Sequence, residues 1–207
     1  RYVREEDNEF VIGAMATQGD VEQFEPLQQF CGGAVVHGIK EILGVQFRNM
    51  ATMGGSVASK FGFSDIIPAL LAVHADIVTY KGGRMSMKDY MNYRERDILV
   101  EIRIPKREVP VAVEALRISR GDFPYLTGSI RRDDTAYEVY IGTRPGAPQL
   151  AEKASALLSE KGLDAFDEAA QIASEELVYQ KNSHASKEYR IEMAKAMVRR
   201  LVKEVAQ

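Results

Sequence analysis

Apolar residues in the first third of the chain change from a short continuous run to helical spacing. The run at residues 10–15 predicts a strand. Residues 20–44 carry apolar side chains every three or four positions, which predicts helices that break at the glycines 32 and 33, with a second short helix over residues 34–43. Residues 46–65 are predicted as loop and turn, and the compact apolar segment 66–75 as a buried helix.

Alternation of apolar and polar residues takes over in the middle of the chain. Residues 76–80 and 84–87 predict a hairpin around Gly82 and Gly83. Short strand-like segments then follow in close succession. They predict an antiparallel meander over residues 98–104, 115–119, 125–131 and 137–142.

Helical spacing returns after residue 146, in a segment rich in Ala, Glu and Lys. Three helices are predicted there, over residues 150–161, 166–177 and 186–205. Strands followed by helices indicate an α+β fold. We expect two units: residues 1–93, and a C-terminal α+β unit of residues 94–207 with an antiparallel sheet and three helices.

Composition excludes several classes of protein and of site. The 207 residues include 27 Lys+Arg and 30 Asp+Glu, so a formal net charge of −3 does not favour nucleic acid or an anionic membrane as the main partner. The single cysteine, Cys31, excludes an internal disulfide and an all-cysteine metal site. No apolar run approaches the ~20 residues of a membrane span, and none at the start reads as a secretion signal. We expect a cytoplasmic protein that binds a cofactor or a protein partner.

The stretch 46–65 carries the densest candidate chemistry of the chain. Gly54 and Gly55 let a ligand approach the backbone, since neither has a Cβ. The N–H groups of such a turn, with hydroxyl side chains nearby, can form a concave donor array for an anion, and Asp65 can accept from sugar hydroxyls. The alternative is a tight turn before a helix that is capped by Ser64 or Asp65.

The same stretch resembles the FAD-binding subunit of the molybdenum hydroxylases, the xanthine dehydrogenase and carbon monoxide dehydrogenase family. Residues 48–56 read Arg-Asn-Met-Ala-Thr-Met-Gly-Gly-Ser, and Asp65 follows Gly55 by ten positions. The Thr-Met-Gly-Gly segment, the aspartate and the spacing between them all agree with the family pattern. Further similarities lie at residues 12–14, 17, 97–100, 104–105, 122–124, 142–145 and 186–190. The resemblance implies a flavin-binding part of the PCMH or vanillyl-alcohol-oxidase-like type, followed by a unit like the C-terminal domain of the CO dehydrogenase flavoprotein.

The resemblance also implies a set of cofactor contacts. In this family the Thr-x-Gly-Gly loop lies against the phosphates and ribityl chain of the flavin, and the later aspartate contacts the cofactor as well. Leu99 matches an apolar residue near the flavin ring, and Arg117 stands where xanthine dehydrogenases place a lysine. Read from the pattern alone, Leu99 is a core strand residue and Arg117 a solvated strand charge. The implied FAD contacts are Thr52, Met53, Gly54, Gly55, Ser56, Ser59, Asp65, Leu99 and Arg117.

The implied function is that of an oxidoreductase subunit within a larger complex. Iron–sulfur clusters (2Fe-2S) on a partner subunit would reduce the flavin, which passes electrons to NAD or oxygen, while a molybdopterin subunit hydroxylates the substrate. The resemblance requires no catalytic acid–base pair in this chain. Asp122 either closes a turn or lies near the electron acceptor.

Two departures from the family pattern change what is expected. The family normally begins with a subdomain whose Ala-Gly-Gly-Thr-Asp-like loop binds the FAD diphosphate from the other side, and nothing in this sequence matches it. A ring-stacking aromatic of some xanthine dehydrogenases is replaced by Ile42. The FAD site of this chain is therefore predicted to be incomplete. The alternative function is a non-catalytic assembly or scaffold subunit that keeps the fold and has lost FAD.

Overall fold

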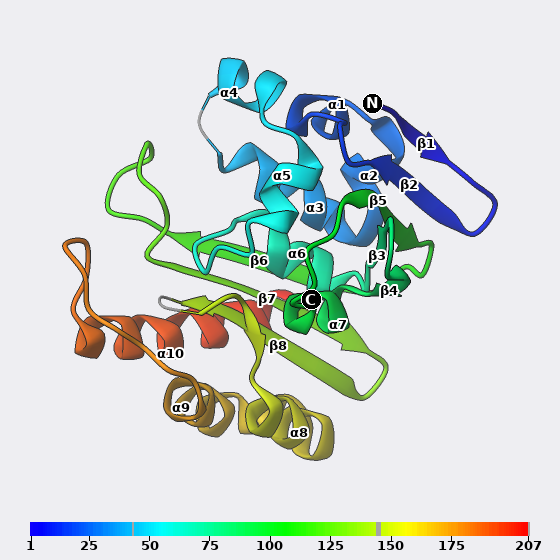
Figure 1. The fold of residues 1–207 in the computed structure, drawn as a ribbon. Coiled ribbons are helices and arrows are strands. Elements are labelled where there is room, and N and C mark those ends of the chain that lie inside the picture. Colours follow the sequence, from blue (N-terminus) through cyan, green and yellow to red (C-terminus); the bar gives the residue numbers. More distant parts are fainter. Residues whose placement is uncertain (43, 144–145, 207) are drawn as a thin grey trace.

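Two antiparallel sheets organise the molecule, one in the first half of the chain and one in the second (Figure 1). The computed structural model describes residues 1–42, 44–143 and 146–206. The first sheet has the strand order β1-β2-β5-β3-β4 and the second the order β6-β7-β8-β9. Three helices follow the second sheet in the chain. The predicted α+β class is confirmed.

The strand over residues 99–105 lies in the first sheet and not in the predicted meander. Ile102 faces Ile12 on one neighbouring strand and Ile77 on the other, and all three are fully buried. The division between the sheets therefore falls after Pro105, whereas the sequence predicted a boundary after residue 93. The strands are β1 (Val3–Glu5), β2 (Glu9–Gly13), β3 (Asp76–Thr79), β4 (Gly83–Ser86) and β5 (Leu99–Pro105).

Short helices occur between the strands of the first sheet in the chain, and those over residues 53–58 and 87–92 pack against its strands. The predicted break at the two glycines is present as a 3-10 turn, in which Gly32 and Gly33 have positive φ angles of 67° and 73°. The helix after the break ends at Lys40, and the predicted end at residue 43 lies outside the described residues. The helices are α1 (Gln18–Glu22), α2 (Glu25–Gln29), α3 (Ala34–Lys40), α4 (Val45–Met50), α5 (Met53–Ala58) and α7 (Met87–Asn92).

Helices α4 and α5 correct the prediction of loop and turn over residues 46–65. The Oγ1 of Thr52 caps α5 by accepting from the N–H of Gly55 at 3.2 Å. A glycine at position 54 also lets α5 pack closely on the chain, because a Cβ there would lie 2.7 Å from the Cβ of Ala14. Capping and close packing thus overcome the low helix propensity of the glycine pair.

The second sheet is a meander covered by the last three helices (Figure 1). The turn predicted at residues 133–134 is present between β7 and β8, where Asp134 has a φ of 54°. Arg144 and Pro145, part of one family similarity, lie outside the described residues. None of the helices in the described ranges combines the length and apolar content that a membrane span requires. The elements are β6 (Val111–Leu116), β7 (Leu126–Asp133), β8 (Ala136–Thr143), β9 (Gln149–Leu150), α8 (Glu152–Lys161), α9 (Phe166–Glu176) and α10 (Lys187–Glu204).

One buried helix, α6 (Ile66–Ala72), joins the two sheets, and its prediction is confirmed. All seven of its residues are buried, and it packs against α3 on one side and against β6, β7 and β8 on the other. The Oγ of Ser129 donates to the carbonyl of Pro68 at 2.7 Å, and Arg131 donates to that of Ala72 at 3.2 Å. The two halves therefore pack on each other through α6, and the second half has a further core cluster of its own between its sheet and the last three helices.

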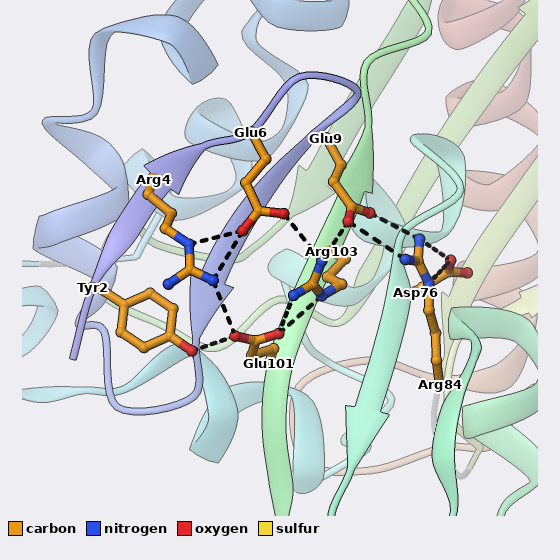
Figure 2. Close-up of polar contacts among 8 residues, drawn as sticks. All are labelled: Tyr2, Arg4, Glu6, Glu9, Asp76, Arg84, Glu101 and Arg103. Carbon is orange, nitrogen blue, oxygen red and sulfur yellow. Dashed lines mark hydrogen bonds and ion pairs between the residues drawn. The ribbon is translucent and has the colours of Figure 1, made fainter.

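The outer face of the first sheet carries a network of ion pairs (Figure 2). Arg103 on β5 contacts the carboxylates of Glu6, Glu9 and Glu101. Arg84 on β4 continues the network, since it contacts both Glu9 and Asp76 of β3 (Figure 2). This surface network connects four neighbouring strands through partly exposed side chains.

Candidate functional site

A pocket of ≈ 550 Å³ lies where five segments of the first half meet the loop between β6 and β7. Its volume is in the range of small-molecule sites in proteins. The described residues that line it are Gln18, Glu41, Ile42, Phe47, Ala51, Thr52, Gly55, Ser56, Ser59, Phe61, Phe63, Ser64, Asp65, Ile66, Arg117, Gly121, Asp122, Phe123 and Pro124.

Helices α1 and α5 supply a polar wall of amide and hydroxyl groups. The Nε2 of Gln18 donates to the Oγ of Ser56 at 3.0 Å, and Ser56 donates to the carbonyl of Thr52 at 3.0 Å. Ser59 uses its hydroxyl in the same way and donates to the Ser56 carbonyl at 2.9 Å. The Oε1 of Gln18 is buried and has no hydrogen-bond partner among the described residues. Hydrogen bonds between α1 and α5 therefore hold this wall together.

The backbone at the start of α5 does not form the donor array that the sequence predicted. The N–H groups of its first two residues donate to the carbonyls of Ala16 and Ala14, at 2.8 and 2.9 Å. The next two donate to the hydroxyl and the carbonyl oxygen of Thr52, at 3.2 and 3.1 Å. All four N–H groups are occupied, because Thr52 caps the helix and the start of α5 packs against residues 14–16. An anion in this pocket finds no free N–H at the start of α5.

Phenylalanine side chains form an aromatic wall. The rings of Phe61 and Phe63 are stacked, with centroids 4.8 Å apart and an interplanar angle of 11°. Phe123, on the loop between β6 and β7, packs against Phe63 at 4.9 Å. Phe61 and Phe123 are more than half exposed, so their faces are available to a flat ligand.

A buried ion pair lies in the same pocket. The Nη2 of Arg117 donates to the Oδ1 of Asp65 at 2.6 Å, and both side chains are only 8% exposed. Arg117 also contacts Glu41 at 3.1 Å and donates to the carbonyl of Asp122 at 3.1 Å. Burial raises the pKa of Asp65 to about 6, and Arg117 offsets only part of that increase. Arg117 thus fixes the loop after β6 against the start of α6.

Of the two caps considered for α6, the structure uses Ser64. Its Oγ accepts from the N–H groups of Ile66 and Ile67, at 3.3 and 3.1 Å. The side chain of Asp65 makes no cap and is directed to Arg117 instead. The alternative considered for this segment, a capped helix start, is therefore correct for Ser64, while the side chain of Asp65 lines the pocket.

Six of the nine residues implied as cofactor contacts are brought together by the fold. Met53 is fully buried in the core of the first half, Gly54 packs on Ala14, and Leu99 belongs to that same core. These three do not line the pocket. The six that do are Thr52, Gly55, Ser56, Ser59, Asp65 and Arg117.

Several pocket residues could not be found by sequence reasoning. Phe61, Phe63 and Phe123 read as scattered aromatics, although the Phe-Gly-Phe spacing of the first two is a signal that their rings share a turn. Gln18 carried no signal, because its role depends on a neighbour 38 residues away. Ile42 lines the pocket, as does Asp122, which also closes its turn by accepting from the N–H of Ser119.

Comparison with known protein families agrees with this geometry. Residues 1–107 match the family described as FAD binding domain in molybdopterin dehydrogenase. The chain belongs to this family. Residues 112–205 match the CO dehydrogenase flavoprotein C-terminal domain, so, apart from Val111 at the start of β6, both sheets fall within the two matched domains. The family resemblance noted in the sequence is thus confirmed.

Individual relatives of this FAD-binding family are distant in sequence. The protein named "Uncharacterized protein YgfM" of Escherichia coli (strain K12) is 25% identical over 118 residues, which cover 56% of this chain and 46% of that protein. The chain thus spans about half the length of the curated relatives it matches.

Solved structures show that the fold is shared along the whole chain. A carbon monoxide dehydrogenase chain from Hydrogenophaga pseudoflava matches with a TM-score of 0.88 and 24% identity, covering 100% of this chain and 78% of that one. Quinoline 2-oxidoreductase from Pseudomonas putida 86 matches with a TM-score of 0.88 and 19% identity, covering 99% and 78%.

The pocket of this FAD-binding domain suits the uncharged half of its cofactor. The aromatic wall matches a flat ring, and the amide and hydroxyl wall matches a polyol chain. In the described lining, Arg117 is the one cation, and it is already paired with carboxylates. The pocket therefore offers no unpaired charge to a diphosphate.

Proposed function

We propose that this chain is the FAD-binding subunit of a molybdenum hydroxylase, working with an iron–sulfur subunit and a molybdopterin subunit, with NAD or oxygen as the final electron acceptor. The observation that carries the proposal is the pocket itself. It lies where the FAD-binding domain meets a loop of the second matched domain, and it gathers six residues implied as cofactor contacts. A xanthine dehydrogenase-like complex is one form that this assembly can take.

In this proposal the chain binds and orients the cofactor, and FAD supplies the redox chemistry when it is bound. The faces of Phe61 and Phe123 pack against the flavin ring. Thr52 and Ser56 border the polyol chain, and Gly55 leaves space for its approach, since a Cβ at that position meets only the Thr52 hydroxyl within 4 Å. The aromatic wall also excludes water from one side of the ring.

A second candidate function is a non-catalytic subunit that keeps the fold and has lost FAD. The occupied N–H groups of α5 favour it, because they remove donors that a diphosphate would use. The two candidates differ in whether the chain takes up flavin, which makes flavin binding the deciding measurement.

Flavin titration of the wild-type chain and of Gly55→Val tests the proposal. We expect the wild type to quench flavin fluorescence in a saturable way and to retain flavin absorbance after gel filtration. Gly55→Val is expected to lose binding by at least about tenfold with an unchanged circular dichroism spectrum, because its side chain occupies the pocket mouth.

The matched control for this test is Ala58→Val, which adds two methyl groups to the exposed end of the same helix, outside the pocket. It is expected to bind flavin as the wild type does. A wild-type chain that remains colourless after exposure to FAD contradicts the proposal and favours the non-catalytic subunit.

A further inference from the structure

Lys60 follows helix α5 in a backbone conformation that lysine rarely adopts. It comes directly after Ser59, the C-cap of the helix, and has a φ of 48°. Glycine and asparagine are the usual residues at this place, because a Cβ disfavours the left-handed conformation. A lysine here therefore costs free energy in the backbone, which makes the contacts of its side chain informative.

The side chain of Lys60 connects the end of α5 with the end of α7. Its Nζ donates to the carbonyls of Tyr90 and Tyr93, at 2.6 Å each. The same ammonium group lies 4.3 Å from the centroid of the Tyr90 ring. A cation is favoured at this end of a helix, where carbonyl oxygens point outward. Lys60 therefore holds the chain after α5 against a helix at least 30 positions away in sequence.

A second close contact lies two residues further on, at Gly62. A Cβ at this position would overlap the carbonyl oxygen of Gly146 and lie 2.6 Å from that of Thr143. The backbone here thus packs directly on the segment that follows β8. The N–H of Ser64 closes the turn by donating to the carbonyl of Phe61 at 3.1 Å. The chain is therefore fixed on both sides of Phe61.

These two contacts belong to the segment that carries the aromatic wall. Phe61 and Phe63 line the pocket, and their rings are stacked. Lys60 and Gly62 do not belong to its described lining. The side chain of Phe61 is 53% exposed, so a flat ligand in the pocket can reach its ring. The ring that is open to a ligand is therefore the one that the two contacts flank in the chain.

We propose that Lys60 is a positioning residue for flavin binding, whose ammonium group holds residues 61–64, the aromatic turn, so that the two phenylalanine rings of the turn stay stacked in the pocket wall. This inference rests on the proposed flavin-binding function. It adds to that function a residue that does not line the pocket and that the family resemblance did not indicate.

Lys60→Asn tests this role, because asparagine accepts the left-handed backbone but is too short to reach the carbonyls of α7. Wild type and variant are titrated with lumiflavin, a flavin with a methyl group in place of the ribityl chain, so that ring contacts alone are measured. The variant is expected to bind lumiflavin about fivefold more weakly, the effect of one lost contact between aromatic rings.

Circular dichroism of the bound ring reports its positioning directly. Lumiflavin is achiral, so a visible signal in the complex arises from the protein groups that surround the ring. At saturating lumiflavin, Lys60→Asn is expected to lose most of the wild-type signal. A residue that only stabilises the fold would leave this signal unchanged once the site is filled.

Two further variants complete the comparison. Lys60→Arg keeps donors for the same carbonyls and is expected to restore the affinity to within about twofold of the wild type. Lys81→Asn removes a lysine from the exposed turn between β3 and β4 and is the matched control. It is expected to change neither the affinity nor the visible signal. An equal loss in this control would overturn the role of Lys60, because it would reflect net charge alone.

The remaining outcomes also decide the inference. Unchanged lumiflavin affinity and an unchanged visible signal in Lys60→Asn overturn the role of Lys60 while the flavin-binding function stands. A weaker affinity with the full visible signal at saturation, or a variant that no longer folds, assigns Lys60 to the stability of the fold and overturns its positioning role. A wild-type chain that binds neither lumiflavin nor FAD overturns the proposed function, and this inference with it.

Discussion

Two groups of arginine–carboxylate contacts in this molecule use the same chemistry in different surroundings. Arg103 and Arg84 lie on the outer face of the first sheet with several carboxylates and partial access to water. Arg117 and Asp65 face each other in the pocket, each only 8% exposed. Both groups join segments that are far apart in the chain.

The carboxylate pKa values of the two groups move in opposite directions. On the sheet, burial disfavours ionisation of Glu9 and Glu101, but other contacts outweigh it and the pKa of each is lowered. For Glu9 these contacts come from Arg103 and Arg84, and for Glu101 from the Tyr2 hydroxyl and then from Arg103. In the pocket, burial outweighs Arg117, and the pKa of Asp65 is raised to about 6. The comparison teaches that the number of donors and the access of water, more than the pairing itself, decide whether a carboxylate is stabilised.

The largest effect is expected for Arg117→Met. This change leaves Asp65 buried without its cation and is expected to lower the free energy of unfolding by about 3–5 kcal/mol at pH 8. Urea denaturation measures it. The double variant Asp65→Leu/Arg117→Met removes both charges and is expected to recover most of the loss. A loss below about 1 kcal/mol in the single variant would show that water reaches Asp65 freely.

An effect of intermediate size on the free energy of unfolding is expected from the ionisation of Asp65 as the pH changes. Its pKa rises from 3.8 to about 6 on folding, so between these values the folded chain holds a proton that the unfolded chain releases. This group therefore stabilises the fold at low pH and loses that contribution as pH rises. Relative to Asp65→Asn, the wild type is expected to lose on the order of 2 kcal/mol between pH 4 and pH 6.5.

Glu101→Gln is the corresponding variant on the sheet. The stability contribution of Glu101 is expected to change with pH in the opposite direction to that of Asp65. Because the pKa of Glu101 is lowered from 4.5, its contribution is present above that pH and is lost as the pH falls below it. Denaturation curves from pH 3 to pH 8 for the wild type and both variants measure the two slopes. Parallel curves for Asp65→Asn and the wild type would rule out the raised pKa.

The smallest effect is expected for Arg103→Met on the outer face of the sheet. We expect a loss of about 1 kcal/mol in low salt, falling further in 1 M NaCl because exposed charges are screened. The Arg117→Met loss is expected to be nearly independent of salt. Equal salt dependence in the two variants would contradict the difference in burial between the two groups.

Sequence patterns predicted most strands and the long helices, because their apolar periods reflect which face is buried. The strand predicted over residues 115–119 lies instead at Val111–Leu116, and β1 was not predicted. The short helices α4 and α5 were missed, since six residues are too few for a clear apolar period. Helix α5 also contains two glycines, and the Thr52 cap and the close contact with Ala14 stabilise it. The strand 99–105 was recognised but placed in the wrong sheet. Alternation shows that a strand is half-buried and gives no information on its neighbours.

Prediction of the site was also limited to individual residues and did not include the contacts between distant segments. The family resemblance identified both Asp65 and Arg117, but not that they contact each other across 52 positions of the chain. The aromatic wall depends on a loop of the second half that brings Phe123 against Phe63. The polar wall depends on Ser56, whose hydroxyl donates to the Thr52 carbonyl. Contacts of this kind are set by tertiary packing, which a single sequence does not display.

Helix α6 links the two halves of the molecule, and this link bears on how cooperatively they unfold. Its seven buried residues contact α3 and the strands β6, β7 and β8, so the same helix packs against both halves. Tyr140 of β8 belongs to the same apolar cluster as the strands of the first sheet. We therefore expect the two domains that sequence families distinguish to unfold together, because loss of the second half would expose α6 and remove Tyr140 from the first cluster.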